Sequence, residues 1–434
     1  MTQPQAQVHE LVEHLFRHEA GRMLATLSRV FGLENLDLAE EVVQEALLQA
    51  LRQWPFQGIP DNPRAWLTQV ARNKALDLLR RRASLRRKER ELEQQFAARQ
   101  SAVAATELSE TAVLGDEQLA MIFACCHPGL LPDAQVALTL KAVSGFSVAE
   151  IARAFLAEDA TIAQRLVRAK RRIREAGITL NLPPPADLSA RLDSVLQVIY
   201  LLFNEGYSAH TGENLVRQDL CGEAIRLACL LIEQPATALP RVHALLALLY
   251  LQAARLPARV DSDGNLLLLA EQDRSQWDQG LLQRGLRELE QSAQGEEISA
   301  YHLQAGIAAL HATSPSFADT DWPALLGLYD QLLAAAPSPV VALNRAIALS
   351  MVHGPEAGLQ SLDELGADPA MRSYYLFPAV RADLLRRLGR TDEAAACYRH
   401  ALACPCTEPE RRFLQRRLEQ LAAVVERNHA AIRT

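Results

Sequence analysis

The sequence predicts an almost entirely α-helical protein: two small helical domains, the second a helix-turn-helix, joined by a linker and followed by a large helical solenoid. Three observations carry this prediction. Helix-forming residues recur at helical spacing, strand signals are scarce, and the last third contains a repeated pattern of small and large residues. With 49% hydrophobic and 22% charged residues among 434, the chain can bury a large core.

Composition and periodicity divide the chain into four parts. They are a helical domain over 8–82, a linker over 83–112, a helix-turn-helix domain over 113–178 and a helical extension over 186–434. The run Pro183-Pro184-Pro185 marks the boundary before the extension. Residues 1–183 carry 23 Lys and Arg against 22 Asp and Glu, whereas the remainder carries 22 against 30. Any nucleic-acid binding is therefore expected in local patches of the first part.

Residues 37–51, DLAEEVVQEALLQAL, predict an amphipathic helix whose first turns are acidic. We expect Asp37 to cap this helix, with Glu40 three residues on, and Trp54-Pro55 to break the chain after it. The acidic residues suit the positive end of the helix dipole. They also suit a docking face for a basic partner protein, and the pattern alone leaves both explanations open.

Residues 61–82 predict a second helix, with Asp61 or Asn62 as its cap and Pro63 in its first turn. Trp66 and Asn73 share one side of it, and the helix ends in three arginines, Arg80, Arg81 and Arg82. Aromatic and basic side chains on one helix can stack on opened bases while contacting phosphates. A lone Trp is more often a core residue, so this interpretation needs the rest of the chain.

A helix-turn-helix is expected near residue 147, where Ser147 and Glu150 form a capping box for a short helix. After a turn over 156–159 comes a basic helix over 160–174. Its apolar stripe is Ile162, Leu166, Ala169 and Ile173, and its polar side is Thr161, Gln164, Arg165, Arg168 and Arg172. A helix that buries one face and presents Thr, Gln and Arg on the other suits the major groove of DNA.

The extension predicts helices, two turns and repeats. We expect a turn at Asn204-Glu205-Gly206, and a tight turn at 261–265 before one short strand over 266–269. A calcium loop is excluded there because Leu266 stands where such a loop needs Gly. The last third contains a tetratricopeptide-like pattern of small and large residues, at Ala382, Gly389, Ala394, Tyr398, Ala401 and Pro405. A weaker copy lies at Ala346, Gly354, Gly358, Leu362 and Pro369. The end of a third copy lies at Tyr329, Leu332 and Pro337. Such arrays bind a protein or peptide ligand.

No catalytic or metal-binding pattern holds, so we expect neither an enzyme nor a cofactor. Cys125-Cys126-His127 lacks a second Cys or His pair, which favours core thiols over a metal site, and Cys404-Pro405-Cys406 lacks one too. Phosphate-binding glycine loops, HExxH and GxSxG are missing. Seven cysteines without an export signal indicate reduced thiols in the cytoplasm, and no apolar run suggests a membrane partner.

Residues 8–176 resemble bacterial sigma factors of the sigma-70 family, extracytoplasmic-function type. Three stretches carry the resemblance: DLAEEVVQEALLQAL, NPRAWLTQVARNKALDLLRRR and FSVAEIARAFLAEDATIAQRLVRAKRRIREAG. They occur in the order and at the spacing of that family. The extension with LLFNEGYSA and its tetratricopeptide-like end resembles a subgroup that carries such a domain in cis, which implies regulation of the sigma domains.

The resemblance implies a dissociable subunit that binds core RNA polymerase and promoter DNA. Docking on core polymerase falls to Asp37, Glu40, Glu41, Gln44 and Glu45. Recognition of the opened −10 element falls to Trp66, Asn73, Lys74, Arg80, Arg81 and Arg82. Recognition of the −35 element falls to Thr161, Gln164, Arg165, Arg168, Lys170, Arg171 and Arg172. The residues themselves also allow a stand-alone helix-turn-helix regulator or a tetratricopeptide adaptor protein.

Overall fold

The computed structural model describes residues 3–85, 110–154, 157–181, 183, 185–207, 218–261, 264–368, 371 and 374–432. Throughout these residues the chain is helical, and its one β-interaction is an isolated antiparallel bridge between Val260 and Leu266. The predicted all-α class is confirmed. Among the described residues, no helix combines the length and apolar character needed to span a membrane. The expected linker over 83–112 lies mostly outside the described residues.

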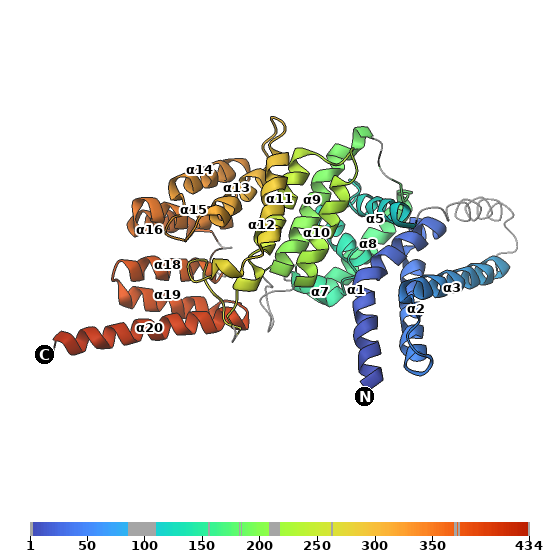
Figure 1. Cartoon of the computed structure of the whole chain (residues 1–434), viewed down its shortest axis with the longest axis horizontal. Helices are drawn as coiled ribbons and strands as arrows, with labels where there is room; N and C mark the ends of the chain where they lie inside the picture. The colour runs from blue at the N-terminus through green and yellow to red at the C-terminus, as the bar shows by residue number, and fades with distance from the viewer. Residues whose placement is uncertain are drawn as a thin grey trace. The chain divides into compact units, whose positions relative to one another are not determined.

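The chain forms two compact units, Met1–Val198 and Ile199–Thr434 (Figure 1). The first holds α1 (Gln3–Phe31), α2 (Leu36–Gln57), α3 (Pro63–Leu85), α5 (Glu110–Cys125), α6 (Pro132–Ala142), α7 (Val148–Ala154) and α8 (Asp159–Glu175). Helix α9 (Pro185–Tyr207) begins in the first unit and ends in the second. The division thus falls within a helix, downstream of the Pro183-Pro184-Pro185 run that the sequence suggests.

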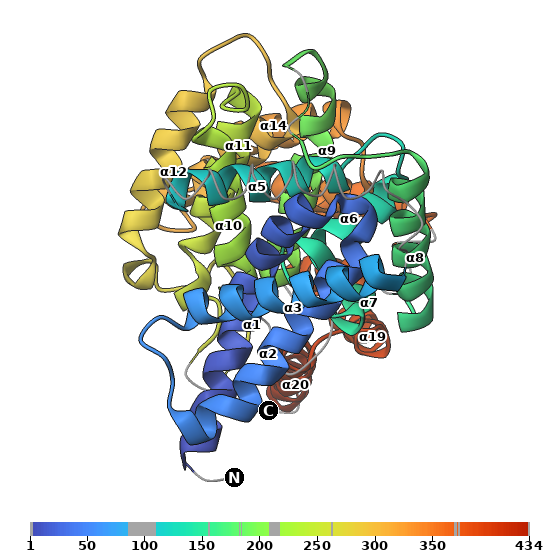
Figure 2. The same ribbon diagram turned by 90° about the vertical axis from the view of Figure 1, so that its right-hand side faces the viewer.

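Helices α1, α2 and α3 pack into one bundle, in which α3 crosses the other two (Figure 2). Asn62 Oδ1 accepts a hydrogen bond from the backbone N–H of Ala65 at 3.1 Å, and Pro63 opens α3, as expected. Two expectations for α2 are wrong. Asp37 lies in its first turn, and Asn35 occupies the cap position without a side-chain capping bond. Nor does Trp54-Pro55 end the helix, which continues to Gln57 before Gly58 turns the chain at φ 83°.

The continuation of α2 through Pro55 has a packing cause. Trp54 is 3% exposed, and its ring meets that of Trp66 from α3 edge to face at 5.4 Å. Holding Trp54 in this contact requires the helix to reach its position. Proline removes one backbone donor and disturbs the preceding turn, and burial of the two indole rings offsets that cost.

The second unit continues from α9 through a series of antiparallel helices. They are α10 (Gln218–Ile232), α11 (Pro240–Ala253), α12 (Gln279–Ser292), α13 (Ala300–Thr313), α14 (Trp322–Ala335), α15 (Pro339–His353), α16 (Pro355–Leu365), α18 (Leu376–Arg387), α19 (Thr391–Ala403) and α20 (Glu408–Ile432). The turn expected at Asn204-Glu205-Gly206 is wrong, because α9 runs through it. The turn at Asp261 is confirmed by Gly264 N–H donating to its carbonyl at 3.0 Å, but the strand after it is a single bridge at Leu266.

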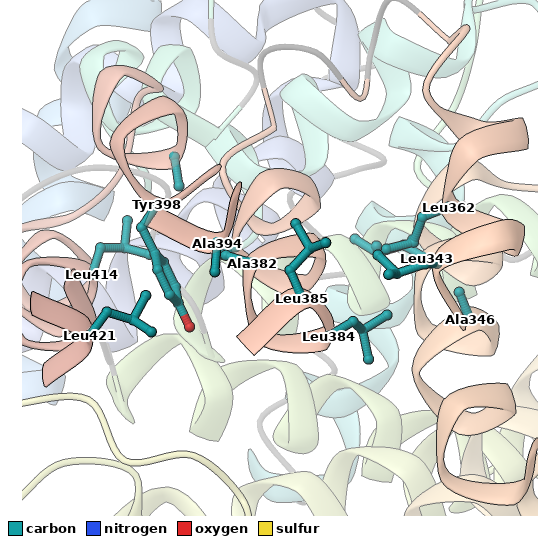
Figure 3. Packing of buried hydrophobic residues seen from close by; sticks show 13 residues of the cluster. Leu343, Ala346, Leu362, Ala382, Leu384, Leu385, Ala394, Tyr398, Leu414 and Leu421 are labelled. Atoms are coloured by element: carbon teal, nitrogen blue, oxygen red, sulfur yellow. The ribbon is translucent and has the colours of Figure 1, made fainter. Parts of the chain in front are cut away.

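The residues of the tetratricopeptide-like pattern lie on helix pairs. Ala382, Ala394, Tyr398 and Ala401 are buried between α18, α19 and α20, and Ala346 and Leu362 are buried between α15 and α16. Figure 3 shows Tyr398 extending toward Leu414 and Leu421 of α20, which closes the end of this core. Each pair leaves an apolar face that the next helix covers, which is the packing logic of helical repeats.

Close packing around a glycine of one helix pair predicts how its substitution changes stability. A Cβ placed on Gly358 of α16 would lie 2.7 Å from the Ser350 Cβ and 2.9 Å from a Leu384 methyl group. We expect Gly358→Ala to lower the free energy of unfolding by about 1–3 kcal/mol through overpacking. Gly222 of α10 has open space around it, so Gly222→Ala should raise the same quantity by about 0.5–1 kcal/mol. Chemical denaturation of both variants checks this, and equal stabilities would contradict the close packing.

Candidate nucleic-acid interface

Helix α8 is built as the sequence predicts. Its apolar residues Ile162, Leu166, Ala169 and Ile173 are all buried. The short helix α7 before it is capped reciprocally: Ser147 N–H donates to Glu150 Oε2 at 2.8 Å, and Glu150 N–H donates to Ser147 Oγ at 3.1 Å. Helices α6 and α7 both pack on α8 (Figure 2). The result is a helix-turn-helix whose second helix buries one face and leaves the other in solvent.

The free face of α8 carries hydrogen-bond donors and positive charge. Thr161, Gln164, Arg168, Arg171 and Arg172 are exposed. Arg165 is only 25% exposed at its side chain, and its Nη2 lies 3.5 Å from Asp133 Oδ2 of α6. Arg172 Nε donates to the carbonyl of Gly129 at 3.4 Å, and Arg171 pairs with Glu175 of its own helix at 2.6 Å. Of the arginines expected at base edges, Arg168 is therefore the more exposed.

Lys170 does not lie on this free face. Its Nζ lies 2.7 Å from Glu40 Oε2 and 2.9 Å from Asp37 Oδ1, both on α2, and Arg174 Nη2 lies 3.5 Å from Asp37 Oδ2. The side chains of Lys170 and Glu40 are 13% and 17% exposed. Burial of the ammonium lowers the pKa of Lys170, but the carboxylates of Glu40 and Asp37 outweigh it and raise that pKa above its usual value. A residue expected near phosphates is thus joined to two residues expected on polymerase.

The acidic face of α2 is divided by this contact. Asp37 and Glu40 are engaged by α8, while Glu41, Gln44 and Glu45 are exposed. Glu45 Oε1 lies 3.1 Å from the Nζ of Lys74 on α3. Because every one of these acids lies within two turns of α2, one helix presents both a covered and an open portion of the same charged surface.

Helix α3 positions the remaining residues of the expected −10 set. Trp66 is half-buried against Trp54, Asn73 is exposed and accepts from Gln69 Nε2 at 3.0 Å, and Arg80 lies 3.7 Å from Asp77. Arg81 and Arg82 belong to the last turns of α3, but their side chains lie outside the described residues. Asn73 and Arg80 thus share an exposed surface on α3, with the Trp66 ring partly accessible beside it.

A second contact joins the α1–α3 bundle to the helices α5–α8, and the sequence did not predict it. A Cβ built on Gly21 of α1 would lie 1.9 Å from the carbonyl oxygen of Val143, directly after α6. Nearby, Thr26 Oγ1 donates to Glu117 Oε2 of α5 at 2.7 Å, and Arg29 Nη1 lies 3.4 Å from Glu117 Oε1. A glycine in the middle of a helical pattern is a signal of close backbone approach, but it does not name the partner.

The cysteines of this unit are core residues. Cys125 and Cys126 are buried, and burial raises the pKa of Cys126 to about 12. A thiol held in its neutral form is a poor metal ligand and a poor nucleophile. Across the described ranges, no group of three or more His, Cys, Asp or Glu side chains is arranged to hold a metal ion.

Comparison with known proteins matches three segments of the chain to protein families. Residues 15–85 match sigma-70 region 2, and residues 120–173 match sigma-70 region 4. Residues 191–293 match a family of unknown function, DUF6596. The region 2 segment covers most of α1 to α3, and the region 4 segment covers most of α5 to α8. No solved structure is significantly similar to the chain.

The uncharacterized protein R00370 of Rhizobium meliloti (strain 1021) is 40% identical over 402 residues, which cover 92% of this chain and 93% of that protein. The likeness therefore includes the extension as well as the two sigma regions. The likeness over most of both chains shows that the chain belongs to the family of this Rhizobium protein. With a region 2 bundle and a region 4 helix-turn-helix, it is a sigma factor of the sigma-70 family, a non-catalytic initiation factor that recognises promoters.

Proposed function

We propose that the chain is an extracytoplasmic-function sigma factor that acts in the cytoplasm, binds core RNA polymerase through α2 and directs initiation at promoters with specific −35 and −10 elements. The single observation that carries this proposal is α8. Its apolar stripe is wholly buried, while Thr161, Gln164 and Arg168 face solvent on a capped helix-turn-helix. Side chains of these types hydrogen-bond base edges in the major groove. Arg171 and Arg172 lie farther along the same helix, where phosphates are the expected partners.

The −10 role falls to α3, where Trp66 offers a ring for stacking and Asn73, Lys74 and Arg80 offer polar contacts. Stacking and phosphate contact together can hold the opened −10 strand. The polymerase role falls to the acidic face of α2, on which Glu41, Gln44 and Glu45 are exposed and Asp37 and Glu40 pair with α8. Core polymerase supplies the catalytic metal and the chemistry, so this chain contributes binding and specificity alone.

We expect Arg168→Ala to weaken −35-dependent initiation by about 1–3 kcal/mol, roughly fivefold to 150-fold, because one base-contacting guanidinium is lost. Binding to core polymerase should stay unchanged. In vitro transcription from a promoter library, with core polymerase and either protein, measures the effect. Arg287→Ala is the matched control, since Arg287 is an exposed arginine on α12 of the second unit. Unchanged initiation by Arg168→Ala would contradict the assignment of α8, and binding to duplex DNA without polymerase would favour a stand-alone regulator.

The contact between α8 and α2 bears on how such a factor is kept inactive. Lys170 and Arg174 form ion pairs with Asp37 and Glu40. Polymerase can therefore pair with those two acids only after α8 moves away. Gly21 against Val143 and Thr26 against Glu117 hold the same two groups of helices together. We therefore propose that the free chain is closed, and that docking on polymerase and release of α8 toward DNA are one coupled step.

Gly21→Ala tests the closed form, because the added methyl group collides with the Val143 carbonyl while raising the helix propensity of α1. The distance between spin labels at the exposed positions Leu48 and Val167, introduced as non-canonical residues to avoid the native cysteines, should lengthen in the free protein. Affinity for core polymerase should rise by about tenfold if the closed form outweighs the open form by about that factor. Gly222→Ala, a helical glycine with open space around it, should change neither quantity.

A label distance that Gly21→Ala leaves unchanged would contradict the closed form, whatever the chain does with polymerase. Conversely, a lengthened distance without any polymerase binding would contradict the sigma-factor role and leave the closed form standing. Raising the salt concentration should lengthen the same distance in the unmodified chain, since Asp37 is 63% exposed and its pairing with Lys170 is screened by ions.

For the extension we propose a regulatory domain of tetratricopeptide-like helix pairs that controls the sigma domains and takes a protein or peptide ligand. Its first helix, α9, starts within the first unit, where Arg191 donates to the Phe123 carbonyl of α5. A comparison of the full chain with residues 1–198, which keep this contact, measures the control: initiation rates should differ. Equal rates at the same promoter would remove the regulatory role.

A further inference from the structure

One corner of the second unit gathers buried polar atoms that have no hydrogen-bond partner within the described part of the chain. They are Arg274 Nη2, Trp277 Nε1, His311 Nδ1, Thr320 Oγ1 and Trp322 Nε1. Trp277 is 3% exposed and Thr320 5% exposed. Folded proteins pair nearly all such groups, because an unpaired buried donor forfeits the hydrogen bonds that water would give it. Five of them among neighbouring residues require an explanation.

These atoms belong to one neighbourhood. Arg274 Nη1 donates to the carbonyls of His311 and Ser314, at the end of α13, and its guanidinium lies 4.7 Å from the centre of the Trp277 ring. The His311 ring lies 5.7 Å from the Trp322 ring at the start of α14. The backbone N–H of Trp322 donates to the Thr320 carbonyl at 2.8 Å. The end of α13, the start of α14 and the turn Arg274–Gln276 therefore meet here.

A second guanidinium shares this corner. Arg255 lies 5.6 Å from the centre of the same Trp277 ring. Its hydrogen bonds reach only amide oxygens and are long, at 3.4 Å to Gln272 and 3.3 Å to Gln252. Among the described residues, neither Arg255 nor Arg274 forms an ion pair with a carboxylate. Asp319 interacts electrostatically with Arg274, and its Oδ2 accepts a hydrogen bond from the hydroxyl of Ser316 at 2.7 Å.

The electrostatic environment agrees with this excess of positive charge. Burial, and then the charges of Arg255 and Arg274, lower the pKa of His311 to about 4. The imidazole is therefore neutral near pH 7. Two cations close enough to influence one histidine would ordinarily repel one another, and an anion between them relieves that repulsion.

A purely structural account covers only part of the observations. Arg274 Nη1 satisfies carbonyls at the end of α13, and Arg255 follows the end of α11, where the helix dipole favours a cation. Neither role uses Arg274 Nη2, and neither supplies an acceptor for the two indole N–H groups or the Thr320 hydroxyl. Those donors call for a hydrogen-bond acceptor, and the two guanidiniums beside them favour an acceptor that carries negative charge.

We propose that this corner is a binding site for an oxyanion, the carboxylate or phosphate group of a ligand, held by Arg255 and Arg274 with indole N–H groups as further donors. A guanidinium presents paired N–H groups in the geometry of carboxylate and phosphate oxygens. Trp277 is buried and Trp322 half-buried, and reduced access of water strengthens each charge-assisted bond. The site belongs to the extension and binds its ligand without polymerase or DNA, so it stands apart from the promoter function.

Isothermal titration of the full chain with inorganic phosphate, and separately with acetate, at constant ionic strength tests the proposal. A dissociation constant on the order of 1 mM or tighter is expected for at least one of the two. Arg255→Gln should weaken it at least tenfold, because one of the two guanidiniums is lost. Arg287→Gln removes the same charge from an exposed site on α12 and should leave it unchanged. Binding of phosphate alone assigns a phosphate ligand, and comparable binding of acetate assigns a carboxylate.

Trp322→Phe keeps an aromatic ring against His311 and Phe317 but removes one donor, so it should weaken binding severalfold without loss of thermal stability. This variant decides the matter if Arg255→Gln fails to fold. NMR titration of His311 gives an independent readout: a bound anion should raise its pKa from about 4, because it offsets the two guanidiniums. No heat and no shift with either anion, or an equal loss of affinity in Arg287→Gln, would overturn the site.

Discussion

The Nζ of Lys170 connects two surfaces that are far apart in the sequence. It lies within 2.9 Å of carboxylate oxygens from Asp37 and Glu40, more than 120 residues earlier. Exposed ion pairs contribute little to stability, and Asp37 is 63% exposed, but the Lys170 and Glu40 side chains are only 13% and 17% exposed, so neither of those two can be left unpaired without cost. The arrangement of the whole first unit depends on that constraint, because separating α8 from α2 requires a substitute cation for the acids. In the proposed docking on core polymerase, a basic surface of the polymerase would be that substitute.

Charge alone would not hold the two groups of helices together. Gly21 lets the backbone of α1 come against the Val143 carbonyl, and no other residue type fits there without displacement. Thr26 and Arg29 satisfy the buried carboxylate of Glu117 on the other side of the same contact. Close backbone packing fixes the register of the contact, and the ion pairs make it reversible by competition. That combination is consistent with the proposed closed form of the free chain, which competition for the acids could open.

Local patterns predicted the elements whose causes are local. The stripe of Ile162, Leu166, Ala169 and Ile173 and the capping box of Ser147 and Glu150 needed nothing beyond helical spacing. Prediction failed where tertiary packing overrides propensity. Pro55 suggested a break, but Trp54 is packed against Trp66 in the turn before it, and α2 continues to Gln57. Asn204 and Gly206 suggested a turn, yet Leu202 and Phe203 are buried in the same helix, and α9 continues.

The candidate site also has a part that local sequence patterns predict and a part that depends on tertiary packing. The exposed side of α8 could be predicted because burial of four apolar residues fixes its rotation, whereas the partner of Lys170 could not, since pairing across the fold leaves no periodic signal. The corner around Trp277 is further still from any motif, because its residues come from four separate segments between 255 and 322.

Charge balance makes that corner informative. In an extension where acids outnumber bases, 30 to 22, arginines find carboxylates readily: Arg241 pairs with Glu297, Arg345 with Asp330 and Arg381 with Asp363. Arg255 and Arg274 both lie against the Trp277 ring, and neither has a carboxylate partner among the described residues, which a shortage of acids does not explain. Because neither guanidinium forms an ion pair with a carboxylate of the described residues, a carboxylate or phosphate from outside can serve as their counterion, and several charge-assisted bonds formed at once would select it.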